Sequence, residues 1–579
     1  MEHQKSVPAA RGRIATVAGV LTVLAVAGGA CGWSPVAHVK GDPGTGGSGV
    51  GGSGVGGSLG TGGAAGARGH GHGAGGSSGD GGVAVATLTD FPVAPIVDPS
   101  APANAPALFD GNAPRPAGAP CISSPVAGVL MPRNWLRPRF DYAAASGENL
   151  FEIVVSVAGF AHPLRVFTGG TSYALEAALW NQLRTSVNDR TITVTVRALS
   201  LSSNGTVQLA PSAAATSSFV IAPVDAPGKI VYWALSDDLG TKVGSLKGFG
   251  IGEESAEVVL TPSQVTSKKS NDTCVGCHAA TPDGQSVGFS MGAQNYVNTL
   301  GQISAGVAGT LPSYLTPAAL ATMQTLHGIP AFSSAHWTAG DRIVLLSDTG
   351  TLHWVQVDGT ASGTLARTGD PGLATEPAFS HDGASVVYVS TRSILDGRLN
   401  NGPADLYRVP YQNRAGGAAL PLSGASDPGY TEYYPAFSPD DRLVAFTRIA
   451  GTGSAYSNSA AEIMVVPFAA GAGGAAVRLA ANDAATCQAG ITSPGLTNDW
   501  PKWSPHAVTA ANGTTYYWLT FSSKRTGTAN AQLYITGVTV DRSGAMTSYP
   551  ALYLWNQPAA DGNHTPSWDD FTIPPIIVP

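Results

Sequence analysis

The sequence predicts an all-β protein in two parts, a sandwich of two sheets followed by a ring of six small sheets. Short runs of alternating apolar and polar residues, separated by Gly, Pro and Asn, fill residues 121–226 and predict the sandwich. In residues 227–579 one short pattern recurs: Pro, a variable residue, an aromatic residue, then Ser or Asp. A pattern that returns at regular intervals predicts one structural unit per repeat, hence a ring of similar sheets.

The N-terminus predicts export. Arg11 and Arg13 precede an apolar run over residues 14–30, which is rich in small residues and short for a membrane span. We therefore expect residues 1–31 to be an export signal. Ala25-Val26-Ala27 would serve as an ordinary signal-peptide cleavage site.

The end of the apolar run, Gly28-Gly29-Ala30-Cys31, resembles the lipobox of bacterial lipoproteins. That resemblance implies a lipid on Cys31 and a protein held at a membrane, in the periplasm or on the cell surface, anchored to the outer membrane of a Gram-negative bacterium. The chain departs from the family at Gly28, where Leu is preferred. Cleavage after residue 27 and lipidation of Cys31 both remain open, and both give an exported protein.

A tether is expected between the signal and the folded parts. Residues 41–82 are almost entirely Gly, Ser, Ala and Thr, which leaves little apolar surface to bury. Residues 83–120 continue as a Pro- and Ala-rich segment. We therefore expect residues 32–120 to be a disordered tether.

The charge pattern argues against nucleic acid as a partner. Only 12% of the residues are charged, and the net charge is -7 at pH 7. The chain has no basic cluster that would follow a phosphate backbone. We expect a redox or cell-envelope protein as the partner instead, and the sequence does not name it.

The predicted sandwich has recognisable strands. They are residues 150–155, 164–167, 191–197 and 218–221, with one helical stretch at residues 174–183. The segment resembles a fibronectin-III or immunoglobulin-like module. No acid, base or nucleophile cluster occurs in it, so a role as spacer or adhesion module is expected.

The repeats have clear signatures, each followed by a β-rich run. The signatures are Pro330-Ala331-Phe332-Ser333, Pro377-Ala378-Phe379-Ser380, Pro435-Ala436-Phe437-Ser438, Pro501-Lys502-Trp503-Ser504 and Pro566-Ser567-Trp568-Asp569. They resemble the WD40-like repeats of TolB-type β-propellers, which implies one four-stranded blade per repeat. Residues 229–234 and 256–260 look like outer strands of the blade that begins at Pro566. Pairing the two ends would close a six-bladed ring and remove its open sheet edges.

Residues Cys274-Val275-Gly276-Cys277-His278 form C-x-x-C-H, the attachment sequence of a c-type haem. Two thiols at this spacing can each bond a haem vinyl group, and the next residue supplies the proximal iron ligand. The sequence therefore predicts one covalent haem c, held by Cys274, Cys277 and His278. A redox C-x-x-C pair, half of a zinc site and a structural disulfide are the alternatives. A zinc site would need a second ligand cluster, which is absent from the sequence.

In TolB-type propellers, which the repeats resemble, the residues just before the Pro of each signature approach the central channel, and that resemblance implies that the motif lies at the channel mouth. Thr281-Pro282-Asp283-Gly284 matches the turn after the other signatures, so His278 occupies the position that Pro holds elsewhere. His564 and His327 precede Pro566 and Pro330 in the adjoining blades and are candidates for the second iron ligand. Each could equally be a polar channel residue without iron.

Two cysteines are left over. Cys121 and Cys487 lie in the sandwich and the propeller, and an exported protein meets an oxidising compartment in which they could form a disulfide. The sequence does not supply the geometry that would decide this pairing.

Three classes of function follow. The first is a membrane-tethered c-type cytochrome that passes electrons through one haem. The alternative is a TolB-like interaction protein of the cell envelope, with the haem as a structural or sensory element. A haem enzyme or hydrolase ranks last, because the sequence contains no H-E-x-x-H or P-loop motif.

Overall fold

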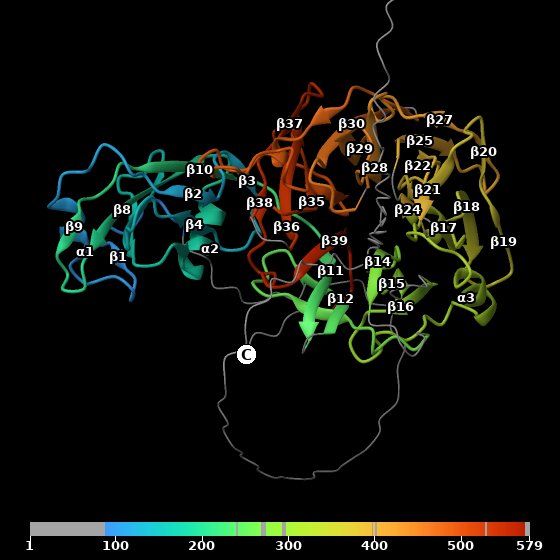
Figure 1. Cartoon of the computed structure of the whole chain (residues 1–579), viewed down its shortest axis with the longest axis horizontal. Coiled ribbons are helices and arrows are strands. Elements are labelled where there is room, and N and C mark those ends of the chain that lie inside the picture. The colour runs from blue at the N-terminus through green and yellow to red at the C-terminus, as the bar shows by residue number, and fades with distance from the viewer. Residues whose placement is uncertain are drawn as a thin grey trace, which may run out of the picture.

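The computed structural model describes residues 87–573, apart from residues 239–240, 268–273, 292–296, 396–397, 400–401, 455, 470 and 527–529. The described part of the chain is almost entirely β-structure, in a sandwich followed by a propeller (Figure 1). Cys31 and most of the expected tether lie outside the described residues. None of the described helices has the length and apolar composition of a membrane span.

The sandwich consists of two sheets. The larger has the order β1-β6-β5-β8-β10-β3 with β9 beside β8, and the smaller has the order β2-β4-β7. Its strands are β1 (Ile96–Val97), β2 (Cys121–Ser124), β3 (Val129–Met131), β4 (Arg139–Ala143), β5 (Leu150–Val157), β6 (Leu164–Thr168), β7 (Ser172–Ala174), β8 (Thr191–Leu201), β9 (Val207–Leu209) and β10 (Ala215–Ile221). Alternate residues of β8 and β10 are buried, as expected of strands with one face on a core.

The sandwich begins earlier than the sequence predicts. Strand β1 pairs with β6, and Phe91 is buried in the main core. Helix α1 (Ala105–Asp110) buries Phe109 against Phe167 of β6. The expectation of a disordered tether up to residue 120 is therefore wrong for residues 87–120. These few apolar residues find partners on the sandwich, although the surrounding Pro and Ala suggest a coil.

The propeller contains six sheets arranged around a central axis (Figure 1). In chain order from the axis outward they are β39-β11-β12-β13, β14-β15-β16, β17-β18-β19, β21-β22-β25-β27, β28-β29-β30-β31 and β33-β35-β36-β37. In the third sheet the inner strand is reduced to a bridge between Ala331 and Leu345.

The strands of the first three sheets are β11 (Lys229–Asp238), β12 (Thr241–Gly250), β13 (Glu257–Leu260), β39 (Gly562–Asp569), β14 (Val275–Ala280), β15 (Ser286–Met291), β16 (Val297–Gln302), β17 (Ile343–Asp348), β18 (Thr351–Gln356) and β19 (Ser362–Thr364). Helices α3 (Pro317–Met323) and α4 (Ser334–Thr338) lie between β16 and β17. Helix α3 buries Ala319 and Met323, and Thr316 caps its N-terminus.

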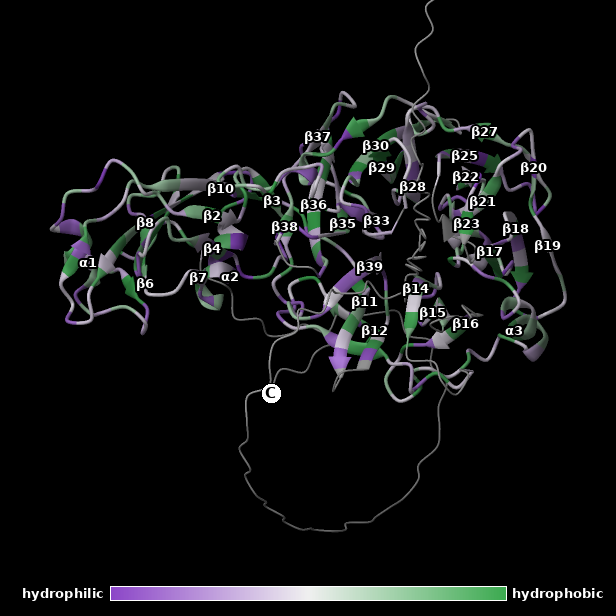
Figure 2. Cartoon of the chain, in the orientation of Figure 1, coloured by the Kyte–Doolittle hydropathy of each residue, from purple (hydrophilic) through white to green (hydrophobic). Residues whose placement is uncertain are grey.

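The strands of the other three sheets are β21 (Leu373–Phe379), β22 (Ser385–Thr391), β25 (Ala404–Pro410), β27 (Leu420–Pro421), β28 (Tyr430–Phe437), β29 (Leu443–Ala450), β30 (Glu462–Ala469), β31 (Ala472–Gly473), β33 (Asp499–Trp503), β35 (Thr515–Ser523), β36 (Gln532–Val540) and β37 (Met546–Ser548). Three further short strands extend these sheets: β32 (Val477–Arg478) pairs with β30, β34 (Val508–Thr509) with β35, and β38 (Leu552–Tyr553) with β36. Two small pairs complete the set, β20 (Ala366–Thr368) with β26 (Gly416–Ala418) and β23 (Ile394–Leu395) with β24 (Arg398–Leu399). Hydrophobic residues run along the strands, for example β36 (Figure 2).

The ring closes between the two ends of the propeller chain, as the sequence predicts. Strand β39 pairs antiparallel with β11, so the last described strand completes the sheet that the first strands begin. This pairing occupies sheet edges that would otherwise be open. Lys229 Nζ also donates a hydrogen bond to the Ile573 carbonyl, which holds the residues after β39 against β11.

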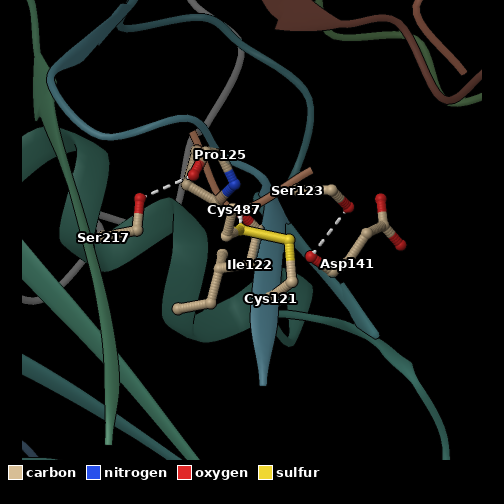
Figure 3. Close-up of a disulfide and its surroundings, with 7 residues drawn as sticks. All are labelled: Cys121, Ile122, Ser123, Pro125, Asp141, Ser217 and Cys487. Atoms are coloured by element: carbon tan, nitrogen blue, oxygen red, sulfur yellow. Dashed lines mark hydrogen bonds between the residues drawn. A yellow bond between two sulfur atoms is a disulfide. The ribbon is translucent and has the colours of Figure 1, made fainter. Parts of the chain in front are cut away.

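The sandwich and the propeller share one core. Leu130 of β3 packs on β36, so closely that a Cβ at Gly537 would lie 2.9 Å from its Cδ2. The Trp555 indole donates a hydrogen bond to the Arg137 carbonyl. The predicted pair Cys121 and Cys487 forms a disulfide that joins β2 to the segment before β33 (Figure 3). Apolar packing, a hydrogen bond and a covalent bond thus all cross the same boundary.

Helix α2 (Ala177–Ser186) lies at this boundary and accounts for the helical stretch expected near residues 174–183. It buries Leu179, Trp180 and Leu183, which share one helix face. The Trp180 indole donates a hydrogen bond to the Trp135 carbonyl, so its polar edge is satisfied inside the core.

Candidate functional site: the channel and its mouth

Four inner strands of the propeller break their pairing at the same place. Two residues bulge out of β21, β28, β33 and β39, and the first of the two has a positive φ. These residues are Glu376 (51°), Tyr434 (53°), Trp500 (58°) and Thr565 (43°), and each precedes a Pro. Positive φ is costly for such residues, so its recurrence marks a backbone shape that the packing of the ring imposes.

The same register holds for the strand that carries the C-x-x-C-H motif. Strand β14 also breaks its pairing, between Val275 and His278. After it, the Thr281 amide donates to the Ser286 carbonyl, just as the Ser380 amide donates to the Ser385 carbonyl. Counting back from this turn puts His278 at the Pro position, as expected, and Cys277 at the position of Glu376.

Cys277 therefore belongs to a ring of equivalent residues. It lies in one buried cluster with Tyr434 and Trp500, and Ile329 packs against the same cluster. The rings of Tyr434 and Trp500 are 3.9 Å apart between centroids. The residues before each Pro position thus meet near the axis and narrow the channel.

Cys274 lies elsewhere. It packs in the separate cluster that contains Val231, Trp233 and Leu246. A Cβ added to Gly244 would lie 2.6 Å from Cys274 Sγ, so the sulfur lies against β12. The two sulfurs of the motif consequently contact different cores.

His278 is buried, and its ring is held by the main chain. Nε2 lies 3.1 Å from the Val231 carbonyl oxygen, which can only accept, so this nitrogen donates. Burial lowers the pKa of His278 to about 4, and the imidazole is neutral at neutral pH. Nδ1 is buried and has no hydrogen-bond partner among the described residues.

These positions test the fit of a covalent haem. Attachment at both thiols requires Cys274, Cys277 and the His278 imidazole to face one space. Here the sulfurs contact different clusters, and the imidazole is bound to β11. In this arrangement the three residues do not fit a doubly attached haem. The described residues also hold no group of three or more His, Cys, Asp and Glu suited to a metal ion.

The two candidates for the second iron ligand, His564 and His327, do not share a pocket with His278. His564 is buried, its ring lies 5.1 Å from that of Tyr456, and burial lowers its pKa to about 3. His327 is partly exposed, and its Nδ1 lies 2.7 Å from Asp348 Oδ1. Of the three histidines, only His278 lines the mouth pocket described next.

A pocket of about 480 Å³ opens where the inner strands leave the bulges. Its wall includes the residue that follows each Pro position. In five sheets this residue is small, namely Ala279, Ala331, Ala378, Ala436 and Ser567, and in the sixth it is Lys502. Trp500, Trp503 and Trp568 also contribute to the lining. A concave site of this size with a few polar groups is typical of ligand binding.

Charged groups lie inside the pocket and on its rim. Burial lowers the pKa of Lys502 to about 8, although Glu376 and Asp569 oppose the shift. Burial raises the pKa of Asp569 to about 6. On the rim, His506 Nε2 lies 2.7 Å from Asp570 Oδ2. Lys502 was not among the predicted site residues, although its repeat carries a signal, since it reads Pro-Lys-aromatic where the repeats at Pro330, Pro377 and Pro435 read Pro-Ala-aromatic.

Fold and pocket together define a β-propeller fused to a β-sandwich, with a candidate ligand site at one mouth of its channel. No family model matches the chain, and no curated protein matches it by sequence. The similar solved structures include TolB from Acinetobacter baumannii, at 14% identity and a TM-score of 0.36, covering 66% of this chain and 80% of that one.

Two further structures illustrate the spread of the similarities. Hydrazine synthase from Kuenenia stuttgartiensis has 10% identity and a TM-score of 0.27, and covers 49% of this chain and 68% of that one. An oligogalacturonate lyase in complex with manganese has 13% identity and a TM-score of 0.27, and covers 56% and 75%. None of these structures identifies an activity for this chain.

Proposed function

We propose that the protein is an exported, membrane-tethered binding protein of the cell envelope, and that its propeller holds a small-molecule ligand in the mouth pocket. The observation that carries the proposal is the pocket itself, a 480 Å³ space at the channel mouth. Its volume falls in the usual range for ligand sites, about 300–1,000 Å³. The narrowing by Tyr434 and Trp500 gives the pocket a floor.

The cellular location is supported by the sequence. The apolar run over residues 14–30 reads as an export signal, and Cys31 stands where a lipoprotein carries its lipid. A disulfide such as that of Cys121 and Cys487 persists in oxidising compartments. The Gly-rich segment after Cys31 would separate the folded parts from the membrane surface.

The test is to fill the pocket and examine what the protein carries. The wild-type protein is purified from its own envelope, denatured, and its extract analysed by mass spectrometry. Ala378→Phe places a ring among the small residues of the wall, and Ala318→Phe, on the exposed face of α3, is the matched control. We expect a small molecule with the wild type and the control and none with Ala378→Phe. Identical extracts from all three proteins, at equal unfolding temperatures, would overturn the proposal.

The second candidate is the c-type cytochrome that the motif predicts, passing electrons through one haem. Its support is the intact Cys274–His278 sequence in an exported chain. Haem attachment would require β14 to present both sulfurs to one space, which they do not share here.

Expression together with the cytochrome c maturation system decides between the candidates. A Soret band that survives acid-acetone extraction, and that is lost in the Cys274→Ala, Cys277→Ala variant, would establish the haem. Colourless protein from cells that mature a control cytochrome would exclude it.

A further inference from the structure

Lys502 differs from every residue at its position in the ring. The equivalent residues of the five other sheets are four alanines and a serine, so the mouth is wide there. At this position, among the six sheets, only the sixth carries a long, charged side chain. Lys502 is half-buried, and its ammonium forms no hydrogen bond or ion pair with any residue in the described part of the chain.

The charges around Lys502 restrict the kind of ligand. Glu376 and Asp569 are near enough to act on its ammonium electrostatically, and Asp570 also lines the pocket. These carboxylates would repel an anionic ligand that approached Lys502. A neutral ligand meets no such repulsion, and the indoles of Trp500 and Trp503 favour an apolar body.

A partly desolvated amine reacts with carbonyl compounds more readily than a fully solvated one. Desolvation favours the neutral amine, which is the nucleophilic form, and buried lysines react with carbonyl compounds for this reason. The burial that lowers the pKa of Lys502 to about 8 makes about a tenth of the amine neutral at pH 7, far more than for an exposed lysine with its pKa of about 10.4. The cavity beside it provides the room for a reaction partner.

We propose that Lys502 is a covalent attachment site, whose amine forms an imine with the aldehyde or ketone group of a small molecule in the mouth pocket. This rests on the proposed function, because it assigns the ligand class of the same pocket. The amine nitrogen bonds the carbonyl carbon, and a proton moves from nitrogen to oxygen to give a carbinolamine. Loss of water then forms the C=N bond, with no change of oxidation state.

Asp569 is the group placed to assist the loss of water. It lines the same pocket, and its pKa, raised to about 6, lets it hold a proton more readily than an exposed aspartate does. It can therefore protonate the departing hydroxyl and be deprotonated again by solvent.

The experiment traps the imine by reduction. The purified full chain is incubated with pyridoxal, an aromatic aldehyde, then reduced with borohydride, and modified lysines are mapped by peptide mass spectrometry. We expect Lys502 to be modified at least tenfold faster than Lys242, which is exposed on β12. Lys502→Met should lose this modification and keep that at Lys242. Modification of Lys502 no faster than Lys242 would overturn the inference.

A second arm uses the natural ligand. Cyanoborohydride added to envelopes before purification should leave a stable secondary amine on Lys502, and the mass of the adduct reports the carbonyl compound. If extracts show a pocket ligand but Lys502 carries no adduct, the inference fails and the proposed function stands. If pyridoxal modifies Lys502 rapidly but the wild type and Ala378→Phe give identical extracts, the proposed function fails instead.

Discussion

Trp233 and His564 stand opposite each other where β11 pairs with β39, so residues from the two ends of the propeller chain lie side by side in one sheet. Next to them, the Val231 carbonyl accepts the hydrogen bond of His278 Nε2. The closing sheet thus also fixes the imidazole of the neighbouring sheet.

Removing β39 should unfold the whole propeller. A chain that stops at Asp561 leaves one edge of β11 unpaired, because β12 covers only the other edge, and the ring is open. We expect the cooperative thermal transition, followed by circular dichroism, to be lost or lowered by more than 10 °C, which for a propeller of this length is a change of about 7 kcal/mol or more. Val258→Ser, on the exposed outer strand β13, is the control and should change little. A truncated protein that melts like the parent would contradict ring closure as a source of stability.

The disulfide between Cys121 and Cys487 should stabilise the protein as a single unit. The two residues are 366 positions apart in sequence, so the bond limits a very long loop of the unfolded chain. We expect Cys121→Ala and Cys487→Ala each to lower the unfolding free energy by about 2–4 kcal/mol. The double variant should cost no more than either single variant, because each removes the same bond. Additive losses in urea unfolding would show that the cysteines act separately.

Asp499 should destabilise the protein as the pH rises. Burial raises the pKa of Asp499 to about 8, whereas an unfolded aspartate loses its proton near pH 4, a value typical of exposed groups. Between these values the folded state binds a proton that the unfolded state has released. Stability from this group is therefore present below about pH 4 and is lost as the pH rises towards about 8.

Asp499→Asn removes this titration and keeps the acceptor that binds the Trp500 amide and the Thr447 hydroxyl. We expect the variant to exceed the wild type in unfolding free energy by at least about 1 kcal/mol at pH 8.5, since one pKa unit corresponds to about 1.4 kcal/mol. The difference should shrink steadily towards pH 4. A difference that does not change with pH would contradict the prediction.

Glu152 should be important to the sandwich. It is 1% exposed, and its carboxylate bonds Arg165 and Arg197 from the neighbouring strands. Removing a buried partner leaves charges without compensation, so Glu152→Ala should cost about 2–3 kcal/mol, somewhat less than fully buried pairs because both arginines are partly exposed. The exposed pair of Arg133 and Asp225 provides the comparison. Asp225→Ala should cost less than about 1 kcal/mol in the same urea titration.

The repeat pattern in the sequence was sufficient to predict most of the fold. Pro, an aromatic residue and the Ser or Asp after it recur closely enough to set the register of the inner strands, including the closing strand at Pro566. The turn at Asp283-Gly284, shared with the repeat at Pro377, sets the place of His278. The packing of residues 87–120 was not predicted, because it depends on a few apolar residues, such as Phe91 and Phe109. The average composition of the segment is dominated by Pro and Ala and does not reveal them.

The candidate site was predicted less well. Spacing alone suggested that Cys274 and Cys277 act together, but in an extended strand with a bulge the two side chains enter different cores. The pocket depends on contacts among residues far apart in sequence, so Lys502 stands out only when the six inner strands are brought around one axis.

The residues that line the channel lie in bulges, where they take no part in the strand pairing that stabilises the sheets. Cys277, Ile329, Glu376, Tyr434, Trp500 and Thr565 occupy places that the backbone creates, and they differ widely in size, charge and reactivity. Since the ladders on either side of the bulge continue without them, single mutations can exchange these residues one at a time. Such a scaffold can change what its channel admits over evolution while the surrounding sheets stay as they are.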